Sequence, residues 1–396
     1  MSVAIAAIGL ATAQENSPAA LPWTPSKWYV SRICYPAGDS SLTGAARWQA
    51  LVKKAFANLG PLTRATPLFV GSCNGDGSRN WEQAFDTSVL LANTAWADER
   101  LPVFSSSCAS GIHALYAATQ LISAGAIDEA LVLAADILSQ SNHENFEGLR
   151  VLAERPSASE GFILGEAAVA LKLVRSENDN QLCGPELDSD LIDHDGLASV
   201  IETFSPEAKS VPIETLYPRF GHTLGASGLL SIALAAASDD DVLVTCRALN
   251  GACAATVVGG DLRAEAQRRK GRWHKAVTPA PLMNPTLKRI ASEAQENRPT
   301  NPPDVFILRM EKPLAPPASA IIGERLLPSA VLEITPGFAS QLVARCWGFS
   351  GRAICLVGDV DHDVYGLRNA LHESGMNVFQ VNLRGSGDNR VVEWNV

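Results

Sequence analysis

Long apolar runs are missing from this chain of 396 residues, since no stretch approaches the ~18 uninterrupted apolar residues of a membrane-spanning helix. The chain has no excess of basic residues either, because it contains 32 Lys and Arg and 42 Asp and Glu residues, which gives a net charge of −10. This balance argues against binding to a nucleic-acid backbone, although a local basic patch for an acidic partner remains open. The apolar fraction of 46% is typical of a globular protein, and the length is sufficient for two domains.

The eight cysteines are scattered and include no CxxC pair, which argues against both a zinc site and a disulfide framework. We expect most of them to be small buried residues in a reducing cytoplasm. His143, His274, His362 and His372 show no metal-ligand spacing, so no metal site is predicted. The apolar segment 1–13 lacks a basic leader region, and we interpret it as a buried first strand rather than a signal peptide.

Residues 1–260 alternate strand-like and helix-like segments, as α/β layers do. The expected strands are Leu68–Gly71, Leu101–Ser105, Ala130–Ala135, Phe162–Leu173 and two within Val242–Val258, and Ala109–Ala124 is an expected helix. Residues 304–396 form a second, smaller α/β unit. Its expected elements are a helix at Phe338–Trp347, a strand at Ala353–Val357, a helix at Val364–His372 and a strand at Val378–Val381.

Between these two units, residues 261–303 are rich in Arg, Lys, Pro and Asn, and we interpret them as a linker. The segment contains a basic cluster made of Arg268, Arg269, Lys270 and Arg272. Such a cluster is either a solvated surface or a docking patch for an acidic carrier protein.

Cys108 is the most informative residue of the sequence. An apolar strand runs into the small residues Ser105–Ser107, Cys108 follows at the corner, and a long helix begins at once. The first turn of a helix has unpaired N–H groups and a partial positive charge, so we expect the thiol pKa to be lowered there. The small neighbours leave room for a thioester, and the backbone N–H of Cys108 is suited to an oxyanion hole.

The segment Ser-Ser-Cys-Ala-Ser-Gly-Ile-His-Ala-Leu at 106–115 resembles the nucleophile elbow of the β-ketoacyl synthases, the condensing enzymes of fatty-acid and polyketide synthesis. Two more segments match that family in order: Glu160–Ala168 is similar to its acidic Gly-rich segment, and Gly221–Gly228 is similar to its GHxxGAAG segment. The resemblance implies the duplicated αβαβα sandwich of the thiolase superfamily. It also implies a catalytic role for His222, as base or hydrogen-bond donor, and a structural role for His113.

The chain departs from the family pattern where a second catalytic histidine is expected. Aligning Pro212-Ile-Glu214 with the family's segment puts Thr203 at that histidine's position, and Tyr217 replaces the family's lysine. Losing one oxyanion donor costs about 3–4 kcal/mol in comparable sites, so acyl transfer is better supported than decarboxylation. His194 and Cys253 are candidate replacements, and thiolase relatives use a second cysteine like Cys253 as base.

The segment 328–358 resembles the approach to the nucleophile in a second ketosynthase N-terminal half. When this segment is aligned with the family without gaps, Val360 stands at the position of the nucleophile, and valine has no group that could form a thioester. The unit therefore resembles a partial, catalytically dead chain-length factor. Ketosynthases dimerise through the strand before the nucleophile, so this unit is expected to supply that strand surface to its own chain or to a partner.

The sequence thus predicts a cytoplasmic acyltransferase or ketosynthase that loads an acyl group on Cys108 with help from His222. The acyl donor is expected to be an acyl-carrier-protein phosphopantetheine or coenzyme A thioester, with no other cofactor, and the assembly a homodimer or a heterodimer with another ketosynthase-like chain. Two alternatives stay open: a non-catalytic chain-length-factor-like partner of a true ketosynthase, and a thiolase-like enzyme without decarboxylation. The retained Cys108 elbow argues against the first alternative.

Overall fold

A computed structural model describes most of the chain. The described residues are 2–14, 17–23, 31–78, 82–156, 160–176, 182–191, 194–204, 209–238, 240–259, 269–322, 325–386 and 390–394.

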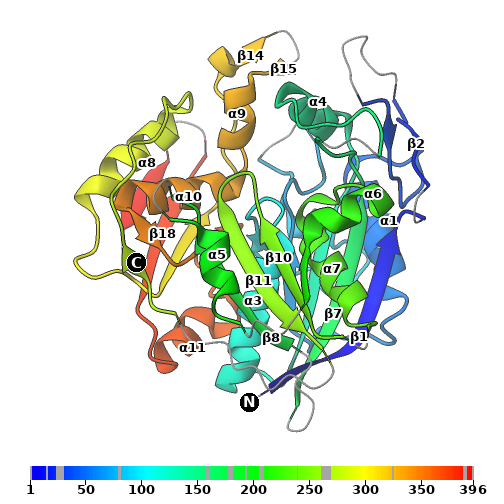
Figure 1. The fold of residues 1–396 in the computed structure, drawn as a ribbon, viewed down its shortest axis with the longest axis horizontal. Coiled ribbons are helices and arrows are strands. Elements are labelled where there is room, and N and C mark those ends of the chain that lie inside the picture. The colour runs from blue at the N-terminus through cyan, green and yellow to red at the C-terminus, as the bar shows by residue number, and fades with distance from the viewer. Residues whose placement is uncertain are drawn as a thin grey trace.

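The larger unit is a layered α/β structure (Figure 1). Its main strands are β1 (Ser2–Thr12), β4 (Leu68–Gly71), β5 (Val103–Phe104), β6 (Glu129–Asp136), β7 (Ala167–Ser176), β8 (Leu182–Ser189), β9 (Lys209–Pro212), β10 (Val242–Arg247) and β11 (Ala252–Val258). Its helices are α1 (Gly44–Phe56), α2 (Thr87–Leu90), α3 (Ser110–Ala124), α4 (Gln140–Gly148), α5 (Gly196–Ile201), α6 (Tyr217–Phe220) and α7 (Ser227–Ala235).

Helices α3 and α7 form the middle layer of this structure. Both contact strands of the first half of the sheet and strands of the second half, whereas α1 covers the outside of the first half and α5 the outside of the second. Helix α3 is apolar on nearly every face, which suits a helix that is covered by a sheet on each side. The arrangement is the αβαβα sandwich that the resemblance predicted.

Strand β1 begins the fold and lies inside the sheet, as expected of the apolar segment 1–13. It pairs along its length with β7, and Val3 reaches Leu182 of β8 on the other side. Most of the other expected elements also form, including α3, β6 and the β10–β11 hairpin with its turn at Asn250 and Gly251. The strand expected at Phe162–Leu173 instead begins at Ala167, because residues 163–165 pair with the segment of His222.

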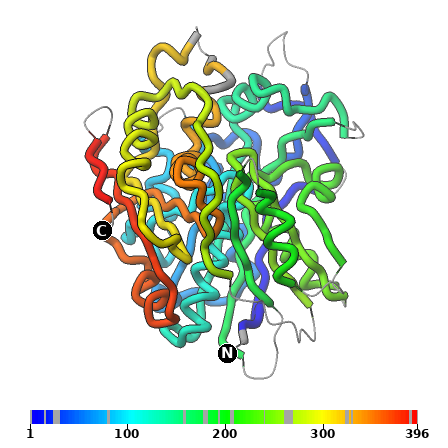
Figure 2. The backbone as a smooth tube through the Cα atoms, turned by 60° about the vertical axis from the view of Figure 1, so that its left-hand side comes forward, coloured from blue at the N-terminus to red at the C-terminus, as the bar shows by residue number. Residues whose placement is uncertain are grey.

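The C-terminal unit continues the same sheet rather than forming one of its own. Its main elements are β13 (Val305–Met310), α9 (Pro328–Glu333), α10 (Pro336–Trp347), β17 (Arg352–Val357), α11 (Leu367–Glu373), β18 (Val378–Arg384) and β19 (Val391–Trp394), and α8 (Pro285–Glu296) precedes it. The described strands follow the order β19-β18-β13-β17-β5-β4-β6-β7-β1-β8-β11-β10-β9. Figure 2 shows the orange-to-red C-terminal segment on the opposite side of the molecule from the green strands.

Helix α8 lies within the segment that the sequence suggested is a linker. Asn284 caps its N-terminus by accepting hydrogen bonds from the N–H groups of Thr286 and Leu287, and Pro285 occupies the first turn. Its buried residues Leu287, Ile290, Ala291 and Ala294 recur at helical spacing and face the core beside α10. The second half of this segment is therefore a packed helix, and residues 261–268, including Arg268, lie outside the described part.

The junction of the two units is the antiparallel pair β5–β17, in which Val103 and Phe104 face Val357 and Leu356. On either side of it the pattern is the same: β4 and β6 are parallel to β5 and β7 is antiparallel, while β13 and β18 are parallel to β17 and β19 is antiparallel. The chain thus contains a local pseudo-two-fold arrangement about the β5–β17 pair. An axis through the Phe104–Leu356 pair relates Cys108 to Val360, the position expected from the sequence, and an axis through the Val103–Val357 pair relates Cys108 to His362.

We predict that removing residues 304–396 changes the assembly state of the remaining protein. The truncation leaves the apolar β5 edge, including the fully buried Phe104, without its partner strand, and an uncovered edge strand pairs with other chains. Size-exclusion chromatography with light scattering should show dimers, larger species or insoluble protein. A truncated chain that stays monodisperse and monomeric would contradict a role of β17 in covering this edge.

Candidate active site

Cys108 lies at a strained corner between β5 and α3. The residue before it, Ser107, has a positive φ of 54°, which is uncommon for a side chain other than glycine and typical of functional turns. Ser110 stabilises the corner, because its Oγ donates to the Ser107 carbonyl and accepts from the Ser106 N–H. Cys108 itself is 4% exposed.

His222 is held in place by the segment that resembles the family's acidic Gly-rich motif. The His222 N–H donates to the Ile163 carbonyl at 2.7 Å, and the Gly165 N–H donates to the His222 carbonyl at 3.0 Å. A Cβ on Gly165 would lie 2.1 Å from the carbonyl oxygen of Phe220, so only glycine permits this approach. The imidazole contacts the rings of Phe162, at 4.3 Å, and Tyr217, at 4.6 Å, and these two rings also contact each other at 5.7 Å.

The Cys108 sulfur and the His222 Nε2 atom are 3.0 Å apart, which makes them a hydrogen-bonded pair. The Nδ1 atom of the same ring accepts a hydrogen bond from the Leu224 N–H at 3.1 Å. A neutral imidazole carries one proton, so an accepting Nδ1 leaves that proton on Nε2. His222 is therefore a hydrogen-bond donor to the sulfur. Of the two roles expected from the sequence, the structure favours the donor over the base.

The thiol of Cys108 is not the preformed thiolate that its helix position suggested. Burial raises its pKa to about 12, and the negative charges of Glu214 and Asp136 act in the same direction. Burial also lowers the pKa of His222 to about 3, so the ring is neutral near pH 7. The pair is a neutral thiol beside a neutral imidazole. The helix terminus does not outweigh desolvation here, because a charge in an apolar interior loses its hydration.

Two backbone N–H groups, those of Cys108 and Leu249, point toward the sulfur and oppose the rise of its pKa. Such a pair of donors beside a nucleophile is suited to hold the oxygen of a tetrahedral intermediate. The sequence predicted the Cys108 donor but not the Leu249 donor. Leu249 belongs to the loop after β10, and only the pairing of β10 with β11 places that loop next to α3's N-terminus.

Asp136, at the end of β6, ties the loops around this site together. Its carboxylate accepts hydrogen bonds from Ser72 Oγ and from the N–H groups of Cys73, Asn74 and Gly225. Burial raises its pKa to about 7 against the effect of these donors. One buried carboxylate thus fixes both the loop after β4 and the turn that follows His222.

Glu166 is a second buried carboxylate that holds several chain segments together near His222. It forms a buried ion pair with Arg47, and its oxygens also accept from the N–H groups of Ala37, Gly38 and Leu138. A buried ion pair with all acceptors used is favourable only when its geometry is complete, as it is here. The acidic residue of the second motif is therefore a positioning group rather than a member of the cavity wall.

Cys108 and His222 line a cavity of about 550 Å³ that opens to solvent. Glu214, Tyr217 and Phe162 form part of its wall. Three arginines, Arg150, Arg155 and Arg247, line the same space.

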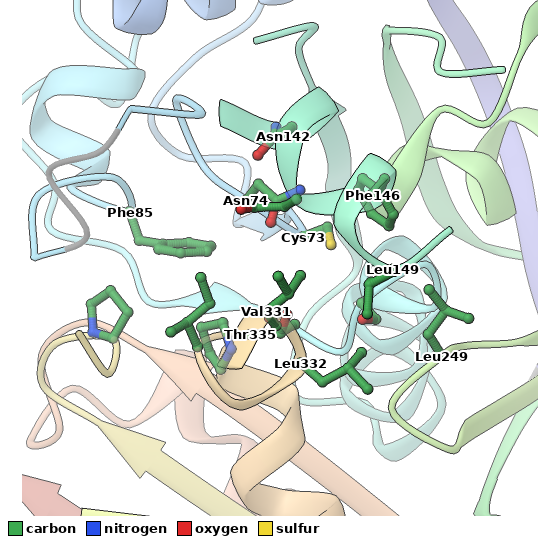
Figure 3. A pocket seen from close by; sticks show the side chains of 15 residues that line it. Cys73, Asn74, Phe85, Asn142, Phe146, Leu149, Leu249, Val331, Leu332 and Thr335 are labelled. Atoms are coloured by element: carbon green, nitrogen blue, oxygen red, sulfur yellow. Dashed lines mark hydrogen bonds between the residues drawn. The ribbon is translucent and has the colours of Figure 1, made fainter. Parts of the chain in front are cut away.

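A second, much smaller cavity of about 30 Å³ lies beside Ser107 and Leu249 (Figure 3). Asn142 and Phe146 of α4 and Leu149, which directly follows this helix, line one side. The C-terminal unit lines the other side through Val331, Leu332, Ile334, Thr335 and Pro336. Both units of the chain therefore shape the space next to the nucleophile.

The remaining candidates from the sequence lie elsewhere. Cys253 is fully buried in β11, its pKa is raised by burial, and it is not among the described residues that line the larger cavity. Thr203 follows α5 and donates to the Val200 carbonyl at 2.6 Å. His194 bonds to Asp188 at 3.1 Å and stacks on His274. His113 pairs with Ser106 inside the core, where burial lowers its pKa to about 3.

One arginine of the basic cluster, read from the sequence as a solvated surface or a docking patch, is used inside the molecule. Arg269 forms an ion pair with the buried carboxylate of Asp188 at 2.9 Å. Within the ranges that the structure describes, no group of three His, Cys, Asp or Glu side chains could hold a metal ion, and no helix is long and apolar enough to cross a membrane.

Comparison with known proteins shows which solved structures share this fold. The family model for 3-oxoacyl-[acyl-carrier-protein] synthase III matches residues 104–191, which include Cys108. A search among curated proteins finds no significant match. The solved structure of a ketosynthase–chain length factor is similar over 98% of this chain and 74% of its own, with 11% identity and a TM-score of 0.64.

Two further solved structures are similar over less of the chain. A ketosynthase solved with its type II polyketide-synthase acyl-carrier protein matches 66% of this chain and 99% of its own, with 14% identity and a TM-score of 0.53. A mutant form of the ketosynthase from module 6 of the bacillaene synthase of Bacillus subtilis 168 matches 76% of this chain and 79% of its own, with 11% identity and a TM-score of 0.52.

The fold is that of the thiolase-like ketosynthases and chain length factors. Within that class, the similarity to a ketosynthase–chain length factor extends over both units of this chain, and the family model covers the nucleophile elbow.

We predict that alkylation of Cys108 by iodoacetamide keeps accelerating with pH up to at least pH 10. Only the thiolate reacts, and a thiol with a pKa of about 12 gains thiolate roughly tenfold per pH unit throughout that range. Peptide mass spectrometry of timed samples, with Cys108→Ser as the control, measures the rate. A rate that levels off below pH 8 would show a preformed thiolate instead.

Proposed function

We propose that this protein is an acyl-thioester transferase of the ketosynthase type, which loads an acyl group on Cys108. The observation that carries the proposal is the 3.0 Å contact between the Cys108 sulfur and His222 Nε2, at the wall of an open cavity and beside two backbone N–H donors. A nucleophile, a donor that stabilises its charge and an oxyanion hole are the parts that thioester exchange needs.

The loading step follows from the protonation states of the pair. The Cys108 sulfur attacks the carbonyl carbon of the donor thioester, and the backbone N–H groups of Cys108 and Leu249 bind the oxygen as it becomes negative. The Nε2–H of His222 stabilises negative charge developing on the attacking sulfur. The C–S bond to the carrier then breaks, and the departing thiolate takes up the proton that the Cys108 thiol releases. No group of the protein changes its net charge.

The proposed donor is an acyl-carrier-protein phosphopantetheine or coenzyme A thioester. Arg150 and Arg155 are exposed beside the cavity and carry the positive charge that a phosphate or an acidic carrier surface requires. Arg247 also lines the cavity but is already paired with Asp190 and Asp195. One structural relative is a ketosynthase solved in complex with its acyl-carrier protein.

The C-terminal unit supports a role as a built-in, catalytically dead partner. Val360 is the residue that the sequence resemblance sets at the nucleophile position of this unit, and β17 covers the β5 edge. In this arrangement the expected homodimer or heterodimer contact through β5 is made within one chain, and a further subunit would need another surface. The alternative of a wholly non-catalytic partner conflicts with the assembled Cys108–His222 pair.

We predict that intact-protein mass spectrometry shows one acyl group on the protein after incubation with acetyl or butyryl coenzyme A. The mass gain should disappear in Cys108→Ala and persist in Cys253→Ala, since Cys253 lies outside the cavity wall. His222→Ala should slow loading by about 10²–10³-fold, the usual effect of removing one such donor. A chain that gains no mass with any acyl donor would favour the non-catalytic alternative.

The same measurement separates the two roles of His222. A glutamine amide donates a hydrogen bond but has no basic nitrogen. His222→Gln should therefore load faster than His222→Ala if the ring acts as a donor. If loading falls equally in both variants, His222 acts as a base and not only as a hydrogen-bond donor.

We also predict a preference for short acyl groups. An acyl chain that leaves Cys108 past Ser107 and Leu249 enters the cavity of about 30 Å³, which Leu332 helps to close. Leu332→Ala should raise the rate of loading from octanoyl coenzyme A, relative to that from acetyl coenzyme A, by about 10-fold. This is the discrimination that a pocket gains from one to two methylene groups. Leu62→Ala is the matched control, because Leu62 lines a different pocket and is not among the residues of this cavity. An unchanged ratio would show that the acyl chain takes another route.

A further inference from the structure

The proposed site has a donor for every negative charge but lacks an assigned group to accept a proton from carbon. His222 carries its proton on the nitrogen that faces the sulfur. No other histidine belongs to the described residues that line the larger cavity, and Cys253 does not line it either. Joining two acyl groups without loss of CO₂ requires a base, because the α-carbon of one thioester must give up a proton.

Glu214 is the carboxylate of this cavity. It lies on the 3₁₀ turn Ile213–Leu216, which contacts α7 and β10, and it shares the cavity wall with Cys108, Tyr217 and His222. Among the described groups, no side chain donates a hydrogen bond to its carboxylate, in contrast to the saturated carboxylates of Asp136 and Glu166. Glu214 is also the charged group with the largest electrostatic effect on the Cys108 thiol.

Tyr217 is placed to complement that carboxylate. It lines the same cavity, and its ring lies 4.6 Å from that of His222. Burial and the nearby charges of Cys108 and Glu214 raise the pKa of the phenol, so it stays protonated and keeps a hydrogen to donate. A protonated phenol in such a site stabilises an enolate oxygen.

We propose that Glu214 is a catalytic base that removes the α-proton of a second acyl thioester, which makes this site a non-decarboxylating condensing centre. The inference rests on the proposed loading of Cys108. The Glu214 carboxylate takes the proton, and Tyr217 donates a hydrogen bond to the enolate oxygen. The enolate carbon attacks the acyl carbonyl on Cys108, a C–C bond forms and the C–S bond breaks. The sulfur leaves as a thiolate and receives the proton from Glu214, so the product is a β-ketoacyl thioester and the enzyme is restored.

The same carboxylate disfavours a malonyl donor. The free carboxylate of a malonyl group would share the cavity with Glu214, and two like charges at short range repel each other. Decarboxylation would also lack the second imidazole donor.

Deuterium exchange at carbon tests this role directly. The full-length protein, first acylated on Cys108, is incubated in D₂O with butyryl coenzyme A, and mass spectrometry measures deuterium at the α-carbon of butyryl coenzyme A and any β-ketoacyl product. Wild type should incorporate deuterium and form the product. Glu214→Gln should lose both by at least about 100-fold, the lower range for a general base, while Cys108 still becomes acylated, because the negative charge of Glu214 then no longer raises the pKa of the thiol.

Glu202→Gln, an exposed carboxylate that does not line the cavity, is the matched control and should behave as wild type. Tyr217→Phe should reduce exchange without abolishing loading. Loading of Cys108 without exchange in wild type, or undiminished exchange in Glu214→Gln, would overturn the role of Glu214 and leave acyl transfer intact. Rapid CO₂ release from malonyl coenzyme A would overturn it as well. Failure of loading itself would remove the proposed function and this inference together.

Discussion

The antiparallel pairing of β17 with β5 is the contact on which the rest of the structure depends. Strand β5 is only two residues long and leads directly to the nucleophile corner, so its position sets that of Cys108. With β17 on one side and β4 on the other, the edge that would otherwise face solvent becomes an interior part of the sheet. Because β17 pairs with β5, residues of α9 and Thr335 lie at the wall of the small cavity beside Ser107. The β5–β17 interface thus sets the positions of both Cys108 and the nearby wall of the small cavity.

Buried carboxylates complete the geometry around that corner. Asp136 and Glu166 lie near the ends of adjacent strands and bind loops that are distant in sequence but meet at His222. Each is surrounded by N–H donors, which offsets the cost of placing an acidic group in the core. Glu214 differs from them because it faces open space with few donors. The contrast separates carboxyl groups that hold the framework from one that is available for proton transfer.

Local motifs predicted the parts of the site that depend on short-range geometry. Cys108 and His222 come from segments whose glycine and small residues encode tight turns. The alternation of strand and helix predicted α/β layers, and the family resemblance of these segments implied the sandwich. The capped, apolar-spaced segment 285–296 carried a helix signal that the surrounding Arg, Lys and Pro residues obscured. The sequence could not predict which residues come close in space. Leu249 and Cys253 are four residues apart, yet only Leu249 lies at the cavity wall, where it is joined by Glu214 from a distant part of the chain. The thiol pKa could not be predicted either, because it depends on burial.

The pseudo-two-fold arrangement within one polypeptide has a consequence for how the site survives in dilute solution. Two separate subunits would dissociate as their concentration fell, and the subunit bearing Cys108 would lose the cavity wall that its partner supplies. Here the chain between the units keeps the local concentration of each near the other high and constant. Specific activity per molecule should not vary with dilution, and no mixture of mismatched halves can arise. The ratio of one thiol-bearing half to one valine-bearing half is set at translation.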